Sequence, residues 1–256
     1  MIRVLGSEIE PSVIMEQYPS GSVERQVLSI MSASSEVYTY NSPDQLKFEL
    51  LMRRKIIEAS IELNNSYFSF STFRKSRCNP DYWERTGEGG FMLKRDVKPS
   101  EAIRDIYSNS RLYSTECATA IVIVYYGSLV TIFPEGLFDQ VFSRIYLMDW
   151  QHLDRTMGIQ RSLRVADYLP GDCRYFRNPD VDPVTPEWQG ENAIYFGDNT
   201  YYGHGIGIGP AEKFIAVLNN HRISGSQTSA YLLDSATRPN FKRLADIYNS
   251  YNPDLQ

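Results

Sequence analysis

Residues 113–126 have the sequence YSTECATAIVIVYY, in which a short polar run leads directly into a long apolar segment. Serine, threonine and glutamate favour the start of a helix, whereas the β-branched run at 121–124 favours a strand. The length of the segment and its alanines favour a buried helix over 114–129. Cys117 then lies in the first turn of that helix, where backbone N–H groups are unpaired and the helix dipole is positive.

The position predicted for Cys117 stabilises a thiolate, which is the reactive form of cysteine. A lone cysteine in an apolar segment can also be a structural core residue, and the local sequence leaves both interpretations open. Glu116 raises the pKa of a neighbouring thiol by charge repulsion, yet an anion is favoured at a helix N-terminus. Its carboxylate would accept the thiol proton or attract a cationic second substrate. Cys78, before a turn, and Cys173, in a predicted strand, fit structural roles better.

A thiol nucleophile needs a proton acceptor and donors for an oxyanion, which we expect to be N–H groups at the helix start. Three histidines are available. His204 lies between two glycines, which allow close approach to its ring. A cysteine at a helix start followed by a histidine on a later strand suits a papain-like arrangement, and a structural histidine is the alternative. His152 is predicted to be a surface residue and His221 to lie at a helix end.

Glu191 belongs to the run WQGEN at 188–192 and opens a predicted strand. Its carboxylate would accept a proton, orient a base or attract an amine; the alternative is a solvated surface glutamate. The later run GHGIGIG at 203–209 lacks the spacing of a dinucleotide-binding loop, and no βαβ unit frames it. No nucleotide cofactor is therefore predicted.

The rest of the chain predicts alternating helices and strands without a linker or an internal repeat. Ser42-Pro43 with Gln45 is a strong helix start, and the apolar spacing that follows predicts a helix to about residue 63, stopping at 64–65. The other predicted elements are a strand at 67–73, a helix from 99, strands at 173–176, 192–197 and 201–208, a helix at 210–220 and a helix at 227–237. Residues 1–40 have a mixed pattern. One α+β domain over residues 1–256 is the simplest account, with 1–40 as a variable N-terminal segment.

Composition restricts the class of protein. The chain has 256 residues, 42% of them hydrophobic, and a net charge of −5, so it has no basic excess for binding nucleic acid. Its three cysteines predict neither a disulfide framework nor a zinc site. The chain start does not resemble a signal peptide, and no uncharged apolar stretch is long enough for a membrane span. We therefore expect free thiols in a reducing compartment. The 18 tyrosines indicate either a partner-binding surface or a tyrosine-rich core.

Several separated blocks together resemble the spore-coat transglutaminases of Bacillus, which are small protein-glutamine gamma-glutamyltransferases. The blocks are AIRDI (102–106), ECATAIVI with YY (116–126), GDC with YF (171–176), WxGEN (188–192), GHG (203–205) and SAYLL with ATR (229–238). The resemblance implies a papain-like single-domain fold and calcium-independent cross-linking of protein glutamines to lysines, without a cofactor. It implies Cys117 as the nucleophile, Glu116 and Glu191 as alternative partners of the thiol, and His204 near them. It also implies spore coat proteins as partners and a place in the mother-cell cytoplasm.

Two other functions are compatible with the sequence. A papain-like cysteine peptidase or amidase would use water in place of lysine and would rely on His204 as its base. A catalytically inactive structural coat protein would use its surface tyrosines and glutamines as assembly contacts. The sequence identifies neither the glutamines and lysines that are joined nor the oligomeric state.

Overall fold

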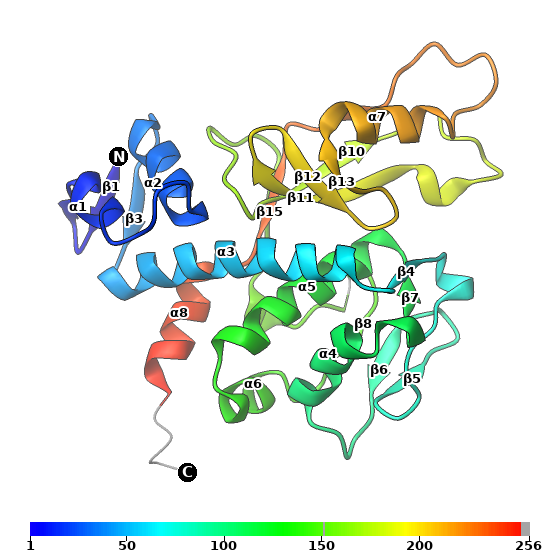
Figure 1. Cartoon of the computed structure of the whole chain (residues 1–256), viewed down its shortest axis with the longest axis horizontal. Coiled ribbons are helices and arrows are strands. Elements are labelled where there is room, and N and C mark those ends of the chain that lie inside the picture. Colours follow the sequence, from blue (N-terminus) through cyan, green and yellow to red (C-terminus); the bar gives the residue numbers. More distant parts are fainter. Residues whose placement is uncertain (151, 252–256) are drawn as a thin grey trace.

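A computed structural model describes residues 1–150 and 152–251. Helix α5 (Cys117–Ile132) runs through the centre of the molecule, and its residues 117–130 are all buried. Helix α3 (Pro43–Asn65), helix α4 (Pro99–Ser108) and a large sheet pack around it (Figure 1). The helix predicted over 114–129 is confirmed. Its apolar residues point in every direction because it is covered on all sides.

The other helices are shorter and lie around this centre. They are α1 (Pro11–Met15), α2 (Val23–Ala33), α6 (Glu135–Val141), α7 (Ala211–Asn219) and α8 (Phe241–Ser250), with short 3-10 turns η1 (Phe73–Lys75), η2 (Ser110–Leu112), η3 (Arg155–Met157) and η4 (Pro186–Trp188). Helix α3 begins as predicted, since the side chain of Ser42 accepts a hydrogen bond from the Gln45 N–H and Pro43 occupies the first position. Within the described residues, every helix is too short or too polar to span a bilayer.

The largest sheet of the described residues has seven strands, all antiparallel, in the order β13-β12-β11-β10-β15-β9 with β14 beside β10. The strands are β9 (Gln160–Ser162), β10 (Cys173–Arg177), β11 (Gly190–Gly197), β12 (Thr200–Gly203), β13 (Gly207–Pro210), β14 (Tyr231–Leu232) and β15 (Ala236–Arg238). Helix α5 packs on β11. An α+β fold with a buried helix on an antiparallel sheet is therefore confirmed.

The smaller sheets lie at the two ends of α3. Near its start, β1 (Ile2–Val4) pairs with β2 (Ser7–Glu8) and with β3 (Tyr38–Tyr40). Near its end, β4 (Ser69–Phe70) pairs with β7 (Ser114–Thr115), while β5 (Trp83–Arg85), β6 (Phe91–Leu93) and β8 (Tyr146–Leu147) form a three-stranded sheet. The strand predicted over 67–73 is thus only two residues long, because the chain turns into η1 soon after it pairs with β7.

Residues 197–200 form the tight turn of a hairpin between β11 and β12. Asp198 and Asn199 have φ of +45° and +57°, a conformation that these two residue types tolerate in tight hairpin turns. The strand predicted over 201–208 is instead two strands, β12 and β13. The chain reverses between them at Gly205, whose φ of +104° explains why a glycine occupies this position.

The helix predicted at 227–237 is wrong. This segment is extended and forms β14 and β15 against β10. The Arg174 guanidinium donates hydrogen bonds to the backbone carbonyls of Leu233 and Ser235, which holds the chain straight between the two strands. Pairing with distant strands therefore overrides the local helical pattern.

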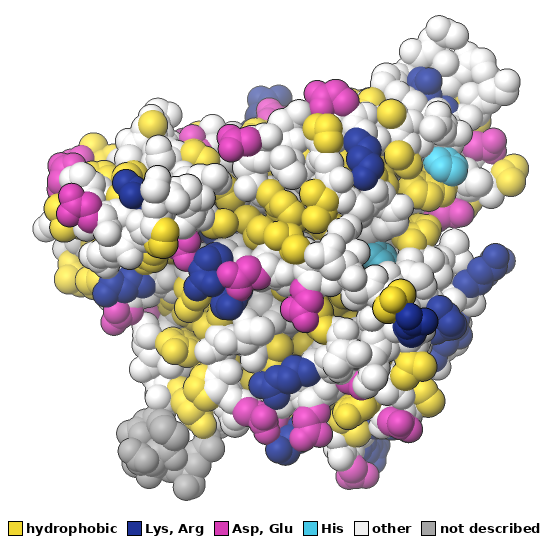
Figure 2. Space-filling model, viewed as in Figure 1, with side chains coloured by type: hydrophobic (Ala, Val, Ile, Leu, Met, Phe, Trp, Pro, Cys, Tyr) yellow, Lys and Arg dark blue, Asp and Glu magenta, His cyan; other side chains and the backbone are white. Residues whose placement is uncertain are grey.

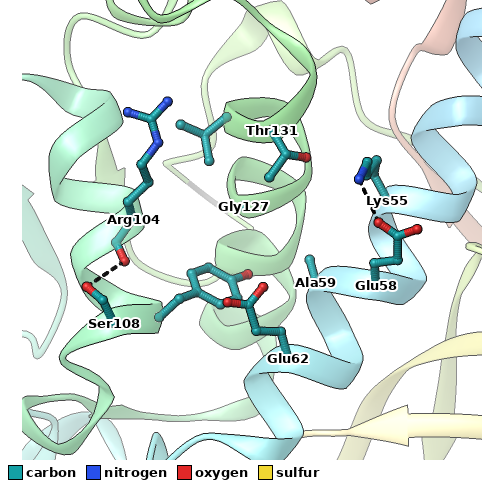
Figure 3. A pocket seen from close by; sticks show the side chains of 10 residues that line it. Lys55, Glu58, Ala59, Glu62, Arg104, Ser108, Gly127 and Thr131 are labelled. Atoms are coloured by element: carbon teal, nitrogen blue, oxygen red, sulfur yellow. Dashed lines mark hydrogen bonds and ion pairs between the residues drawn. The ribbon is translucent and has the colours of Figure 1, made fainter.

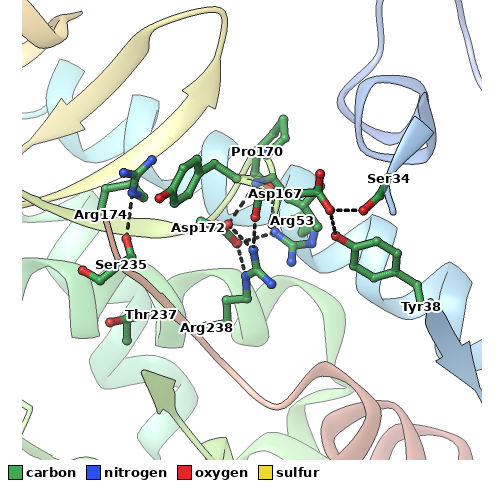
Figure 4. A network of polar contacts seen from close by, with 12 residues as sticks. Ser34, Tyr38, Arg53, Asp167, Pro170, Asp172, Arg174, Ser235, Thr237 and Arg238 are labelled. Atoms are coloured by element: carbon green, nitrogen blue, oxygen red, sulfur yellow. Dashed lines mark hydrogen bonds and ion pairs between the residues drawn. The ribbon is translucent and has the colours of Figure 1, made fainter. Parts of the chain in front are cut away.

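Residues 1–40 form α1, α2 and the strands β1 to β3, with an apolar cluster that also takes in residues of α3. A buried ionic network lies between α3 and the large sheet (Figure 4). In it the Arg53 guanidinium of α3 is 2.9 Å from both Glu49 and Asp172, and Arg238 of β15 is 2.6 Å from Asp172. Asp172 thereby fixes the start of β10 against the helix.

The face of the molecule seen in Figure 2 carries basic and acidic side chains interspersed. Apolar side chains gather in its middle, above α3, where the strands of the large sheet lie in Figure 1. No extended basic surface appears on this face, which agrees with the net charge of −5.

Candidate active site

Cys117 lies on a cleft of about 1140 Å³. The cleft is bordered by residues 72–74, by the start of α5, by 149–150, by strands β9 and β10, and by the loop 183–190. Cys117 is the first residue of helix α5 and is 8% exposed, so its side chain reaches the cleft from the centre of the molecule. The sequence-based prediction of a cysteine in the first turn of a buried helix is confirmed.

Glu116 caps helix α5. Its carboxylate oxygens accept hydrogen bonds of 2.6 Å from the backbone N–H groups of Ala118 and Thr119, and its carbonyl accepts one of 3.1 Å from Ala120. Burial raises the pKa of this carboxyl, while these donors act in the opposite direction. Three of the N–H groups expected to hold an oxyanion, those of Ala118, Thr119 and Ala120, are therefore already occupied. Glutamate at the cap thus satisfies two of the donors that a helix start leaves unpaired.

Glu191 lies in β11 behind the cleft and is only 1% exposed. Burial raises the pKa of its carboxyl well above the usual value, and Glu116 raises it further, whereas hydrogen bonding with Cys117 acts to lower it. In the resting geometry its Oε1 atom is buried without a hydrogen-bond partner. The solvated surface glutamate considered from the sequence is therefore wrong, and a buried carboxylate faces the thiol.

The thiol of Cys117 has a pKa well above its ordinary value. Burial is the main cause, followed by the charges of Glu191 and Glu116. The expectation that the helix start would favour a thiolate is therefore wrong for the resting protein. The helix N–H groups act on Glu116 instead of the sulfur, so the thiol stays protonated until a base takes its proton.

Asn192 was not identified as a site residue from the sequence. Its side-chain Nδ2 lies 3.7 Å from the Cys117 Sγ, and the residue lines the cleft. Hydrogen bonding from its backbone and side chain lowers the pKa of the thiol, against the larger effects that raise it. Its place directly after Glu191 in WQGEN was the available signal, because one strand then presents an acceptor and a donor to one sulfur.

His204 lies just after β12 and is 4% exposed. Burial lowers the pKa of its imidazole to about 4, so the ring is neutral at pH 7. The ring stacks on Phe68 with centroids 4.7 Å apart, and its Nδ1 lies 3.4 Å from the Tyr202 hydroxyl. Its Nε2 atom is buried without a partner, and in residues 1–150 and 152–251 no hydrogen bond joins the ring to Cys117. The geometry departs from a cysteine–histidine pair.

The other candidate residues lie outside this cluster. His152 is exposed, as predicted, and packs on Tyr146. His221 follows the end of α7, as predicted, and its ring stacks on Trp188 with centroids 4.3 Å apart. Cys78 and Cys173 are free thiols, and burial raises the pKa of both, which fits the structural roles expected for them.

A second cavity, of about 280 Å³, lies between α3, α4 and the last turns of α5, at the opposite end of that helix from Cys117 (Figure 3). Figure 3 shows Lys55 and Glu58 paired at its edge, at 2.7 Å. It contains neither a cysteine nor a histidine among its lining residues. In the described part of the chain no group of three or more His, Cys, Asp or Glu side chains is arranged to hold a metal ion.

Comparisons with known proteins identify the family of the chain. The family model described as protein-glutamine gamma-glutamyltransferase matches residues 1–248, including the first 40 residues. A protein-glutamine gamma-glutamyltransferase of Bacillus mycoides is 44% identical over 238 residues, which cover 93% of this chain and 86% of that protein. One from Bacillus cereus (strain B4264) is 40% identical over 253 residues, covering 99% and 91%.

A solved structure supports the same assignment. The transglutaminase from Geobacillus stearothermophilus, without its C-terminal extension, superposes with a TM-score of 0.77 at 48% identity, over 81% of this chain and 98% of that one. The buried helix and sheet that carry Cys117 thus belong to a fold with a known transglutaminase relative. Since the family model covers nearly the whole chain, the protein belongs to the protein-glutamine gamma-glutamyltransferase family and is a transferase that acts on protein glutamine side chains.

Proposed function

We propose that Cys117 is the nucleophile of this transferase and Glu191 its main proton acceptor, and that the products are gamma-glutamyl-lysine cross-links between proteins. One observation carries the proposal: Cys117 lines the large cleft, has the carboxyl of Glu191 as a hydrogen-bonding neighbour, and is the first residue of the buried helix α5. Cys173 also borders the cleft, but burial and the charge of Asp172 raise its pKa without a hydrogen-bonding carboxylate partner.

In the first half-reaction the Cys117 sulfur attacks the carboxamide carbon of a protein glutamine, and Glu191 takes the thiol proton as the C–S bond forms. A raised pKa suits Glu191 to this step, because a carboxylate that binds protons more tightly is a stronger base. The C–N bond then breaks, and the nitrogen leaves as ammonia with the proton that Glu191 held. A thioester remains on Cys117.

In the second half-reaction the neutral ε-amine of a protein lysine attacks the thioester. Glu191 accepts one amine proton, the C–S bond breaks, and the proton returns to the sulfur. An isopeptide bond joins the two side chains. A carboxylate beside the thiol also favours arrival of the lysine in its cationic form, so the two glutamates suit an amine acceptor better than water.

Glu116 and His204 have different parts in this proposal. Glu116 holds the first turn of α5, and its carboxylate is close enough to the sulfur to raise the thiol pKa, so it is the alternative acceptor when Glu191 is absent. His204 is neutral and packed between Phe68 and Tyr202, so its part is to position the site rather than to carry the proton.

We further propose that the chain, residues 1–256, works as one catalytic domain on proteins of the spore coat, in the mother-cell cytoplasm and at the forming coat. The resemblance to spore-coat transglutaminases supports this, as do relatives in Bacillus. The reaction is proposed to need neither calcium nor a cofactor. Cross-linking of isolated coat protein in the presence of a calcium chelator tests the proposed substrates and the calcium independence together. Loss of activity with the chelator contradicts calcium independence.

The assay that tests the proposed site combines casein with a fluorescent primary amine. The wild-type protein is expected to label and cross-link casein, and Cys117→Ala is expected to lose all labelling. Cys78→Ala is the matched control, since it removes a half-buried thiol outside the cleft and is expected to keep full activity. Labelling by Cys117→Ala contradicts the proposal. Casein cleavage without labelling indicates the peptidase alternative.

A further inference from the structure

The tetrahedral intermediates at Cys117 need hydrogen-bond donors, and in the first turn of α5 the N–H groups of Ala118, Thr119 and Ala120 already have acceptors. An oxyanion beside a helix start is ordinarily stabilised by the free N–H groups of the first turn. Here those of Ala118 and Thr119 donate to the Glu116 carboxylate at 2.6 Å, and that of Ala120 donates to the Glu116 carbonyl. A carboxylate on the same groups would also repel a second negative charge. These three N–H groups cannot hold the oxyanion, so a donor is needed elsewhere around the sulfur.

Asn192 offers such a donor. Its Nδ2 group is 3.7 Å from the Cys117 sulfur and faces the cleft that admits the substrate. The residue is held in the interior of β11, opposite Tyr175 of β10, so a paired strand fixes its backbone. A strand position keeps a donor in place more exactly than a loop does, and a preorganised donor is what stabilises developing charge.

The distances agree with such a role. The oxygen that becomes charged is bonded to the carbon that the sulfur attacks, so it lies within about 3 Å of the sulfur. A group already in contact with the sulfur on the cleft side can therefore reach that oxygen. Glu191 can only accept a proton there, whereas the Asn192 amide can only donate at Nδ2. The two neighbouring residues supply complementary functions to one atom.

We infer that Asn192 is a catalytic residue whose side-chain amide donates a hydrogen bond to the oxyanion in both half-reactions. The inference rests on the proposed function, in which Cys117 is the nucleophile. As the C–S bond forms, the carbonyl π electrons move to the oxygen, and the Asn192 N–H stabilises the resulting charge. The charge returns to the carbonyl when the C–N bond breaks in acylation, or the C–S bond in transfer to lysine.

The test compares catalysis with simple alkylation of the same thiol in Asn192→Ala and in Asn192→Leu, which keeps the volume. Asn65→Ala, at the exposed end of α3, is the control. Casein labelling gives kcat and KM. Iodoacetamide gives the rate at which the Cys117 thiol is alkylated across pH. The rates are compared at the high-pH plateau, where every thiol is ionised and a change in its pKa does not alter the rate. Alkylation forms no oxyanion. Thermal melting shows which variants are folded. At least one variant is expected to fold, because Asn192 is only half-buried at the cleft.

We expect kcat to fall about 10²–10³-fold in the Asn192 variants, with KM changed less than about 3-fold and the plateau alkylation rate within a few-fold of wild type. An unchanged kcat overturns the inference, and so does an alkylation plateau that falls as much as kcat, since Asn192 would then only position the sulfur. These outcomes leave the proposed nucleophile intact. Labelling by Cys117→Ala, in contrast, overturns the proposed function itself.

Discussion

Two buried clusters of charge lie on neighbouring parts of the large sheet and are built in opposite ways. Around Asp172 every charge has a partner: Arg53 and Arg238 approach it at 2.9 and 2.6 Å, and Glu49 binds the other side of Arg53 (Figure 4). Around Cys117, two carboxylates are buried beside a thiol, and among residues 1–150 and 152–251 neither of them forms an ion pair with a basic side chain. Oε1 of Glu191 is left without a partner.

The pKa directions express the same difference. Burial alone would raise the pKa of Asp172, but the two arginines hold it below its usual value. The pKa of Glu191 is raised well above its usual value because burial is not offset by a cation. A buried charge that is fully paired supports the fold, whereas an unpaired one is retained at a cost in stability, and such groups gather at sites of chemistry.

Breaking the paired cluster is expected to have the largest effect. Asp172→Asn removes one of the two carboxylates that pair with the buried Arg53 and leaves only Glu49. The free energy of unfolding should therefore fall by about 3–5 kcal/mol. Urea unfolding measures this. Asp198→Asn, in the exposed hairpin turn, is the control and should change stability by less than about 0.5 kcal/mol. A loss of under about 1 kcal/mol in Asp172→Asn would mean that the network is not what holds β10 to α3.

Removing the charge of Glu191 should have the opposite effect, with a large loss of activity and no loss of stability. Glu191→Gln is expected to lower kcat for casein labelling about 10²–10³-fold, because a general base is lost, while the free energy of unfolding stays the same or rises. Some activity should remain through Glu116, and the double variant with Glu116→Gln should lose it. Full activity in the double variant would refute a role for either carboxylate.

Strand β12 lies close to Glu191, so adding a single methyl group to this strand is expected to have a smaller effect. A Cβ added at Gly203 would lie 2.5 Å from the Phe214 ring and 2.7 Å from Glu191 Oε1. Gly203→Ala should therefore lower stability by about 1–3 kcal/mol and reduce kcat as well, because Glu191 must move. Gly87→Ala, where a Cβ meets nothing within 4 Å, is the matched control. A Gly203→Ala enzyme with wild-type kcat would show that the position of Glu191 is not critical.

The smallest expected effect is a difference in pH dependence. Asp172 has a lowered pKa, so its contribution to stability is complete above its unfolded value of about 3.8 and is lost as the pH falls below it. Glu191 has a raised pKa, so the folded state binds more protons than the unfolded state from about pH 4.5 upward. Stability should therefore decline with rising pH in this window, by at most about 1.4 kcal/mol per pH unit.

Urea midpoints of wild type and Glu191→Gln between pH 4 and pH 8 measure this slope. The two proteins should be closest in stability near pH 4, and the variant should gain relative to wild type as the pH rises. Parallel curves for the two proteins would show that Glu191 titrates normally and would remove the contrast between the clusters.

The sequence predicted the elements whose signals are local. Helix α3 has its cap at Ser42-Pro43, and α5 has a glutamate before a long apolar run, so both starts follow from adjacent residues. The segment 227–237 was predicted as a helix because its residues allow one, but its partners are β10 and β9, which only the folded sheet brings alongside.

Cys117, Glu116 and Glu191 lie together as expected from the sequence, but their electrostatics were not predicted. The blocks around Cys117 and Glu191 resemble a known family, and this resemblance, not spacing, brought the two residues together. The raised pKa of the thiol depends on burial and on a carboxylate from β11, neither of which the residues beside Cys117 reveal. The sequence did not indicate Asn192 for the same reason, because its contact with the sulfur joins strand β11 to helix α5.

The complete burial of α5 has a consequence for how the protein opens. Amide hydrogens in a helix covered on every side exchange with solvent only through global unfolding, whereas a cleft border exchanges through local openings. Cys117 lies where the two regimes are expected to meet, because it is the first residue of α5 and its side chain faces the cleft. The borders of the cleft are therefore expected to open locally while the helix that carries the nucleophile stays fixed.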